Sequence, residues 1–144
     1  MFDVQASIGP AHILKPDFGS DLLQELQKYV LAKNVNLAWI SGVGAVSKAV
    51  IRYYDQPKKE WIELRLDKRL EVAGMWGNVS LLNGEPIVHV HIVLADETGH
   101  AHGGHAEVIS ARAIVNAGGP WVEQVVRGTL RLNSSEGVRL VRGS

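Results

Sequence analysis

The sequence predicts an α+β fold in which one main helix packs on a single, largely antiparallel sheet. Three observations carry this prediction. One amphipathic segment lies near the start of the chain, after it come runs of alternating or β-branched residues, and an Asn-Gly pair joins two of these runs. Because the chain has 144 residues and no internal linker, repeat or charge block, we expect a single domain covering residues 1–144.

The helix is predicted to begin after Ser20 and to end near Lys33. Its apolar residues recur at the spacing of one helical face, at Leu22, Leu23, Leu26, Tyr29 and Val30. Ser20 is the expected N-cap, and Asp21 would lie favourably at the positive end of the helix dipole.

Most of the remaining chain is predicted to form strands. The candidate segments are residues 36–41, 48–55, 61–66, 70–82, 86–95, 107–116 and 125–132. Asn83 and Gly84 are typical of a type I′ turn, which needs positive φ at both central residues, so the strands on either side should form a hairpin. Gly74 and Gly77 within the fourth segment indicate a bulge or a close backbone approach.

Composition excludes several classes of protein. The chain has no cysteine, so a disulfide or a thiolate metal site cannot form, and a metal site would need histidine, carboxylate or water. Lys+Arg and Asp+Glu number 15 each, which argues against specific DNA binding because phosphate contacts need a basic surface. No membrane-spanning apolar run and no signal peptide are visible, so a cytoplasmic location is expected.

Histidines provide the only concentrated chemistry, and five of the six lie between positions 89 and 105. His89 and His91 are two residues apart in a predicted strand and should therefore project from the same face. His105 follows Gly103 and Gly104, a flexible pair expected to let the backbone turn and bring a third imidazole to the same ion. Three histidines leave a fourth position open, which is the pattern of catalytic rather than structural zinc.

Other interpretations of these residues stay open. Strand histidines are often only half-buried side chains, His100 and His102 are expected to be solvated loop residues, and His12 is expected to be unrelated. Glu71 lies in an apolar strand, where a buried carboxylate would need a partner such as a histidine. The Gly-x-Gly at residues 42–44 favours a structural turn, because a nucleotide loop would need a third glycine or a lysine-serine pair. The four tryptophans are scattered and are expected in the core or an interface.

The order and spacing of several segments resemble the plant and prokaryote conserved (PPC or PCC) domain in its stand-alone prokaryotic form. The segments are residues 41–46, 70–72, 77–80 and 83–86, His89-x-His91, and Gly103-Gly104-His105. The resemblance implies one antiparallel sheet of about seven strands, a homotrimer, and a metal site in which His89, His91 and His105 occupy the family's histidine positions. Two features depart from the family. Ala106 and Glu107 follow the third histidine where the family usually has an apolar residue, and the AT-hook of the plant proteins is absent.

A rival pattern is the cupin motif, but Glu97 comes one residue too late for its spacing. The preferred hypothesis is therefore a homotrimer that binds a divalent metal, zinc, and takes a small molecule at the open position. If the protein is an enzyme, a water activated by zinc would be the nucleophile, and Glu71 or Glu107 would be candidate bases. The alternative is a DNA-associated or protein-scaffold regulator with structural histidines.

Overall fold

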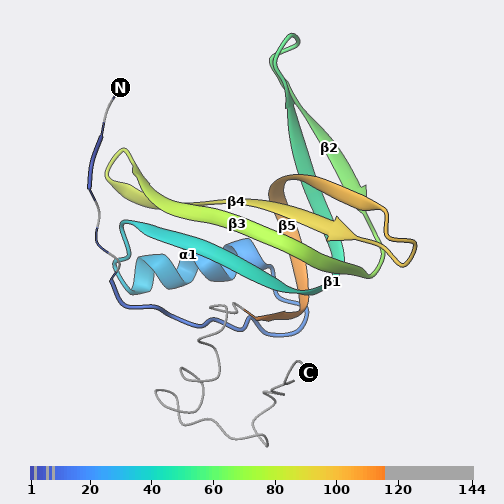
Figure 1. Cartoon of the computed structure of the whole chain (residues 1–144), viewed down its shortest axis with the longest axis horizontal. Coiled ribbons are helices and arrows are strands. Elements are labelled where there is room, and N and C mark those ends of the chain that lie inside the picture. Colours follow the sequence, from blue (N-terminus) through green and yellow to red (C-terminus); the bar gives the residue numbers. More distant parts are fainter. Residues whose placement is uncertain (2, 6, 8, 116–144) are drawn as a thin grey trace, which may run out of the picture.

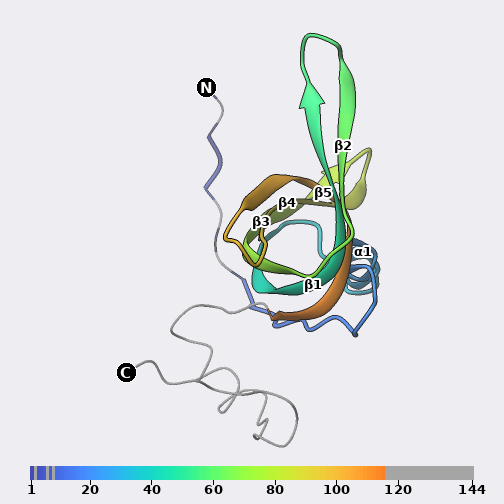
Figure 2. The same cartoon turned by 90° about the vertical axis from the view of Figure 1, so that its right-hand side faces the viewer.

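A strongly curved antiparallel sheet and one helix form the described part of the computed structural model, which covers residues 1, 3–5, 7 and 9–115 (Figure 1). The elements in chain order are α1 (Leu22–Ala32), β1 (Ala38–Asp55), β2 (Glu60–Leu66), β3 (Leu70–Leu82), β4 (Glu85–Ala95) and β5 (Ala101–Val115). The strand order is β2-β1-β3-β4-β5, and β1 also pairs with β5. This second pairing curls the sheet into a barrel, which is visible end-on in Figure 2.

The α+β class and the antiparallel sheet are confirmed, but the number of about seven strands is wrong for the described residues, which form five. The predicted strands at 36–41 and 48–55 are parts of one long strand, β1. Residues 42–44 do not turn the chain; they form a bulge in the pairing with β3, where Gly44 has a φ of 154°. The candidate strand at 125–132 lies outside the described residues.

The predicted hairpin between β3 and β4 is confirmed. Asn83 and Gly84 have φ values of 53° and 86°, both in the left-handed region that a type I′ turn requires. The register then places Asn78 opposite His89 and Trp76 opposite His91. The turn therefore sets which β3 side chains lie beside the two histidines.

Helix α1 begins one residue later than predicted, because Asp21 and not Ser20 is the N-cap. Ser20 is held in a strand-like contact, in which its carbonyl accepts from the Ala111 amide at 2.9 Å, and its hydroxyl donates to the Asp17 carbonyl. One oxygen of the Asp21 carboxylate accepts from the Gln24 amide at 2.9 Å, and the other accepts from the Ile109 amide of β5 at 3.1 Å. Asp21 therefore caps the helix and fastens it to the sheet.

Gln27 provides a second attachment of the helix to the sheet, because its side-chain amide binds the edge of β4. Its Nε2 donates to the Pro86 carbonyl at 2.7 Å, and its Oε1 accepts from the Val88 amide at 3.1 Å. β5 pairs with β4 only from His91 to Ala95, so no strand among the described residues lies beside this stretch of β4 on that side. Gln27 of the helix thus satisfies backbone groups of β4 that no described strand pairs with.

Replacing Asp21 with alanine is expected to lower the free energy of unfolding by roughly 1–3 kcal/mol, because one change removes a helix cap and leaves the Ile109 amide without its acceptor. Urea unfolding followed by circular dichroism measures the effect. Asp67→Ala, at an exposed position, is the control and should change stability by less than about 0.5 kcal/mol. Equal stability of the two variants would contradict this account of the helix attachment.

The core lies on the inner face of the barrel, between the sheet and α1. Val90, Ile92 and Leu94 of β4 are almost fully buried and point inward together with Leu22 and Leu26 of the helix. Because side chains alternate along a strand, His89 and His91 are placed on the outer face.

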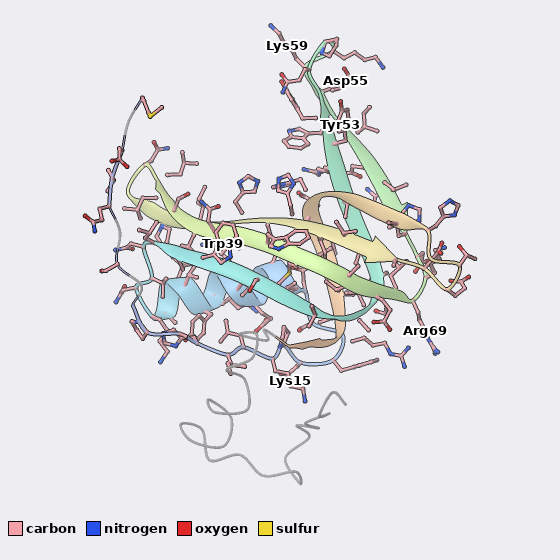
Figure 3. The ribbon with its side chains drawn as sticks, in the orientation of Figure 1. Lys15, Trp39, Tyr53, Asp55, Lys59 and Arg69 are labelled. Carbon is pink, nitrogen blue, oxygen red and sulfur yellow. The ribbon has the colours of Figure 1, made fainter. Side chains whose placement is uncertain are left out.

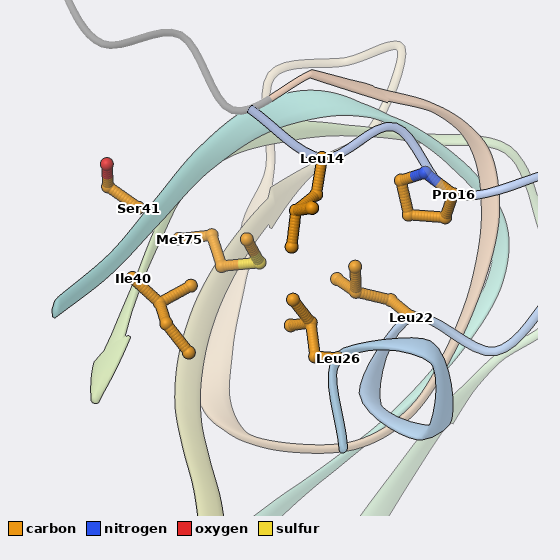
Figure 4. Close-up of a pocket in the computed structure, with 7 residues that line it drawn as sticks. All are labelled: Leu14, Pro16, Leu22, Leu26, Ile40, Ser41 and Met75. Atoms are coloured by element: carbon orange, nitrogen blue, oxygen red, sulfur yellow. The ribbon is translucent and has the colours of Figure 1, made fainter. Parts of the chain in front are cut away.

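A small pocket lies at one end of this core (Figure 4). It is lined by Leu14, Pro16, Leu22, Leu26, Ile40, Ser41 and Met75. The Ser41 hydroxyl is the one polar side-chain group among these residues, so the pocket offers no chemistry and belongs to the packing of the helix on the sheet.

Two strands extend beyond the barrel as an arm, which we define as residues 53–62. Up to Arg52, β1 pairs with β5, and from Tyr53 to Asp55 it pairs with β2 alone. The arm projects away from the body in both views (Figures 1 and 2), and Figure 3 labels Tyr53, Asp55 and Lys59 along it. The described part of the chain contains no helix with the length and hydrophobicity of a membrane span.

Candidate metal centre

Three histidines from two neighbouring strands meet on the outer face of the sheet. His89 and His91 project from β4, and His105 lies on β5 directly opposite His91 in the pairing register. Gly103 and Gly104 do not form the predicted hinge; they are strand residues that pair with Val93 and Ile92. His105 therefore reaches the other two by cross-strand pairing, because residues directly opposite in an antiparallel pair lie only about 4.5–5.5 Å apart.

The distances between the rings suit a single small ion. The Nε2 atoms of His89 and His91 are 3.2 Å apart, and one ring nitrogen from each of the three histidines lies within 4.8 Å of the others. Tetrahedral zinc with bonds of about 2.0–2.1 Å separates its nitrogen ligands by roughly 3.3 Å. The His89–His91 pair already has this separation. A modest rotation of the rings would bring the other nitrogen–nitrogen distances, which are at most 4.8 Å, to the same value.

Gly104 allows β5 to approach β1 beside His105. A Cβ atom at Gly104 would lie 2.7 Å from the carbonyl oxygen of Arg52, which is backbone and cannot yield easily. At Gly103 the nearest atoms to a Cβ would be at 3.5 Å, an ordinary contact. Of the two glycines, only Gly104 is required by the packing, and it is the one adjacent to the histidine.

Burial keeps His105 in the form that binds metal. Loss of hydration is the main cause that lowers the pKa of His105 below its usual 6.5, and the neighbouring His89 and His91 lower this pKa further. Its Nδ1 is buried and has no hydrogen-bond partner among the described residues. An unsatisfied buried polar group costs roughly 1–3 kcal/mol, so the site contains a nitrogen for which a ligand would be an advantage.

Arg52 and Trp61, at the base and on the side of the arm, complete the surroundings of His105. The Trp61 indole packs on the His105 imidazole with ring centroids 5.4 Å apart, and Tyr54 packs on Trp61 at 5.2 Å. Arg52 lies opposite His105 in the register and binds Glu63 at 2.7 Å and Glu107 at 3.1 Å. Sequence reasoning missed both residues, because they lie more than 40 positions upstream of His105 and no local motif marks them.

The two carboxylates considered as bases have different places. Glu107 is two residues from His105 on the same strand, and its carboxylate is held by Arg52. Glu71 is exposed and lies opposite Ala45 and Ala95, four residues along β4 from His91, which is roughly 13 Å in a strand. The structure therefore brings Glu107, and not Glu71, near the histidines.

The remaining histidines lie apart from the cluster. The backbone amide of His100 donates to Asp96, and the His102 Nε2 is 3.9 Å from the carboxylate of the same aspartate. His102 is not a loop residue as expected, because it pairs with Leu94 at the start of β5. His12 is hydrogen-bonded to the Tyr29 hydroxyl at 2.8 Å. Among the described residues, only His89, His91 and His105 form a group of three or more potential ligands.

Comparisons with known proteins agree with this architecture. The profile of the Plants and Prokaryotes Conserved (PCC) domain matches residues 4–117. A metal-containing protein of Archaeoglobus fulgidus has a similar structure, with a TM-score of 0.75 and 35% identity over 80% of this chain and 81% of that protein. A plant- and prokaryote-conserved protein of Pyrococcus horikoshii has a TM-score of 0.75 and 30% identity over 80% of each chain.

Curated relatives match over shorter stretches. The glycerol-3-phosphate dehydrogenase of Pseudomonas tolaasii is 56% identical over 36 residues, which is 25% of this chain. The matches span only 7–13% of the length of the curated relatives. The similar structures, which are covered over most of their length, are therefore the better guide to the histidine site.

Proposed function

Because the chain belongs to the Plants and Prokaryotes Conserved domain family, we propose that His89, His91 and His105 bind one divalent metal ion and that this ion is zinc. The observation that carries the proposal is the convergence of three imidazoles within 4.8 Å on one face of the sheet. The metal content named for the similar Archaeoglobus fulgidus protein supports it. Neutral imidazole is also a donor that zinc prefers.

Three protein ligands leave a coordination position for a small molecule. When bound at such a site, zinc supplies Lewis-acid chemistry and lowers the pKa of water. The chain's own contribution is to hold the rings: β4 fixes two of them, the register with β5 fixes the third, and Trp61 limits access to His105 on one side. Glu107, held by Arg52, is the one carboxylate of the two candidates that lies on the same strand as a proposed ligand.

Elemental analysis of the purified protein tests the proposal. We expect close to one zinc ion per chain, and zinc added to metal-stripped protein should bind with the same stoichiometry. Metal-stripped protein that binds neither zinc nor another divalent transition metal at neutral pH would overturn it. That result would favour the alternative, a scaffold or DNA-associated protein in which the histidines are structural.

Metal binding is expected to weaken below about pH 6, because protons then compete for the three imidazoles. The pKa of His105 is lowered in the folded chain, so it binds fewer protons there than in the unfolded chain. The resulting contribution to the stability of metal-free protein is present above pH 6.5 and is lost as the pH falls below that value. Zinc titrations and urea unfolding between pH 5 and pH 8 measure both effects. Affinity that does not change over this range would contradict imidazole ligation.

We also propose that the protein assembles as a homotrimer, as the resemblance to the family implied. Large apolar side chains on the outer sheet face and on the arm support assembly, since exposed apolar patches commonly mark interfaces. Light scattering should give about three times the chain mass of 15.7 kDa.

A cytoplasmic location and a single domain extending over residues 1–144 stay predictions.

Specific DNA binding is not part of the proposal. With 15 acidic and 15 basic residues, the chain should bind duplex DNA only weakly and without sequence preference. A mobility-shift titration at physiological salt is the measurement. Sequence-selective binding with a Kd near 10⁻⁸ M, about what specific complexes reach, would contradict this expectation.

A further inference from the structure

We propose that the open coordination position takes a small planar aromatic ligand with one anionic metal-binding group, and that Trp76 is the surface on which its ring stacks. The inference rests on the proposed zinc site and deepens it, because it names the chemical class of the small molecule. Three features around the histidines carry it: a tryptophan on each side of the cluster, an exposed ring face held beside His91, and charged side chains that are already paired.

The cluster lies in a row of side chains that runs across four neighbouring strands on the outer face of the sheet. Trp76 of β3 lies opposite His91 of β4, and His91 lies opposite His105 of β5. Arg52 of β1 follows His105 in the row. Because neighbouring strands are only about 4.7–4.9 Å apart, each member of the row is next to the following one. The two imidazoles therefore have an aromatic neighbour on one side and a charged neighbour on the other.

The Trp76 indole is held as a flat surface beside His91. A Cβ atom at Gly74 would lie 2.7 Å from Cζ2 and 3.1 Å from Cζ3 of the indole, so the ring covers this glycine and a larger residue would lift it. Trp76 is nevertheless 50% exposed. One face of the ring thus rests on β3, and the other face is open to solvent next to the histidines. An indole fixed in this way can stack on a ligand at a small entropic cost.

Trp61 forms the wall on the opposite side of the cluster. Its indole packs on His105 with ring centroids 5.4 Å apart, and Tyr54 packs on Trp61 at 5.2 Å. Trp61 is also half exposed. The histidines therefore lie between two partly exposed indoles. Sites for small organic molecules are commonly lined in this way, by aromatic side chains around a few polar groups that fix the orientation of the ligand.

The charged side chains beside the cluster are already paired with one another. Arg52 binds Glu63 at 2.7 Å and Glu107 at 3.1 Å, and Arg65 also binds Glu63. The two arginines and two glutamates together carry no net charge. A phosphorylated ligand carries about 1.5–2 negative charges and is normally held by cationic donors that are free to bind it. A ligand with a single anionic group needs no such donor, because the metal ion itself can take that group.

An aromatic monoanion matches both the tryptophans and the paired charges. Its anionic group would bind at the open coordination position, and its ring would extend over Trp76, which begins one strand away from His91. Offset-stacked rings add roughly two- to tenfold in affinity beyond the area that they bury. Trp39 and Tyr53, which are more exposed than Trp76, are not part of this surface and stay available for the proposed assembly.

Two hydroxamates with the same metal-binding group test the proposal on the zinc-loaded protein. Benzohydroxamate carries a phenyl ring where acetohydroxamate carries a methyl group, so the ratio of their affinities isolates the contribution of the ring. Calorimetric titration should show benzohydroxamate binding about tenfold more tightly to the wild type. Trp76→Ala should lower this ratio by about threefold or more and keep close to one zinc ion per chain, because Trp76 is not among the proposed ligands.

Trp39→Ala is the matched control. It removes another exposed indole from the outer face, but Trp39 lies opposite Asn78 and not opposite a histidine, so the ratio should stay at the wild-type value. Trp76→Leu, which keeps an apolar side chain without an aromatic face, replaces the alanine variant if that variant loses zinc or does not fold.

The outcomes separate this inference from the proposed function. Equal affinity of the two hydroxamates for the wild type would overturn the inference and leave the zinc site standing. Equal ratios in the Trp76 and Trp39 variants, or tighter binding of inorganic phosphate than of benzohydroxamate, would overturn it as well. A wild type that binds no divalent metal before any hydroxamate is added would instead refute the proposed function.

Discussion

Replacing His91 with alanine is expected to abolish stoichiometric zinc binding while leaving the fold intact. His91 is central to the cluster: its Nε2 is 3.2 Å from that of His89, and it lies directly opposite His105. Without it, only two imidazoles remain. Removing a residue that merely hydrogen-bonds to a ligand already lowers metal affinity by about 10–100-fold, so removing a ligand itself should lower zinc affinity by at least roughly 100-fold. Because the side chain is exposed on the outer face, the free energy of unfolding of metal-free protein should change by less than about 0.5 kcal/mol.

The histidines outside the cluster provide the matched controls. His100→Ala and His102→Ala remove the same side chain from a segment only about ten residues away, close to Asp96. Both variants should keep close to one zinc ion per chain by elemental analysis. If instead His91→Ala keeps its metal and a control variant loses it, the ligands are His100 and His102. Unchanged metal in every variant would mean that the protein has no specific histidine site.

Replacing Gly104 with alanine is expected to damage the metal site without changing any ligand. The new Cβ would lie 2.7 Å from the Arg52 carbonyl oxygen, so β5 must move away from β1 or tilt. Because His105 is the next residue, this movement shifts the third imidazole relative to the pair on β4. Overpacking of this kind costs about 1–3 kcal/mol of stability, and zinc affinity should fall by about tenfold or more.

Gly103→Ala is the control for that experiment. It adds the same methyl group one residue earlier, where the nearest atoms would be at 3.5 Å, so stability and zinc affinity should stay close to those of the wild type. Urea unfolding of metal-free protein and zinc titration separate the two effects. If the two glycine variants behave alike, the close approach of β1 does not position His105, and the glycine pair has another role.

Patterns with a short range in the sequence predicted the parts of this protein that depend on local geometry. The apolar spacing at Leu22, Leu26 and Val30 indicated α1, and all three residues are buried in the structure. Asn83-Gly84 indicated the hairpin, since its backbone requirement is contained within two residues. Alternation along the strand placed His89 and His91 on one face, opposite the buried Val90 and Ile92.

Long-range pairing decided the rest. The Gly-x-Gly at residues 42–44 was expected to turn, but pairing with β3 on one edge and β5 on the other draws the backbone into one long strand. In the same way, Gly103 and Gly104 were expected to bend, yet their amides and carbonyls belong to the β4–β5 pairing. Glycine permits both outcomes, so the choice depends on which strands are available as neighbours.

Which histidines share a strand face could therefore be predicted from the order of residues, whereas the groups that surround them depend on how the strands pair. Period-two alternation is a property of one strand, so it can be recognised without knowing its partner. Register is a property of two strands, and it places His105 opposite both His91 and Arg52, with the Trp61 indole against its ring. That register depends on barrel closure by β1 and on the close contact between Gly104 and Arg52, and in both cases the β1 partner lies far from His105 in the chain.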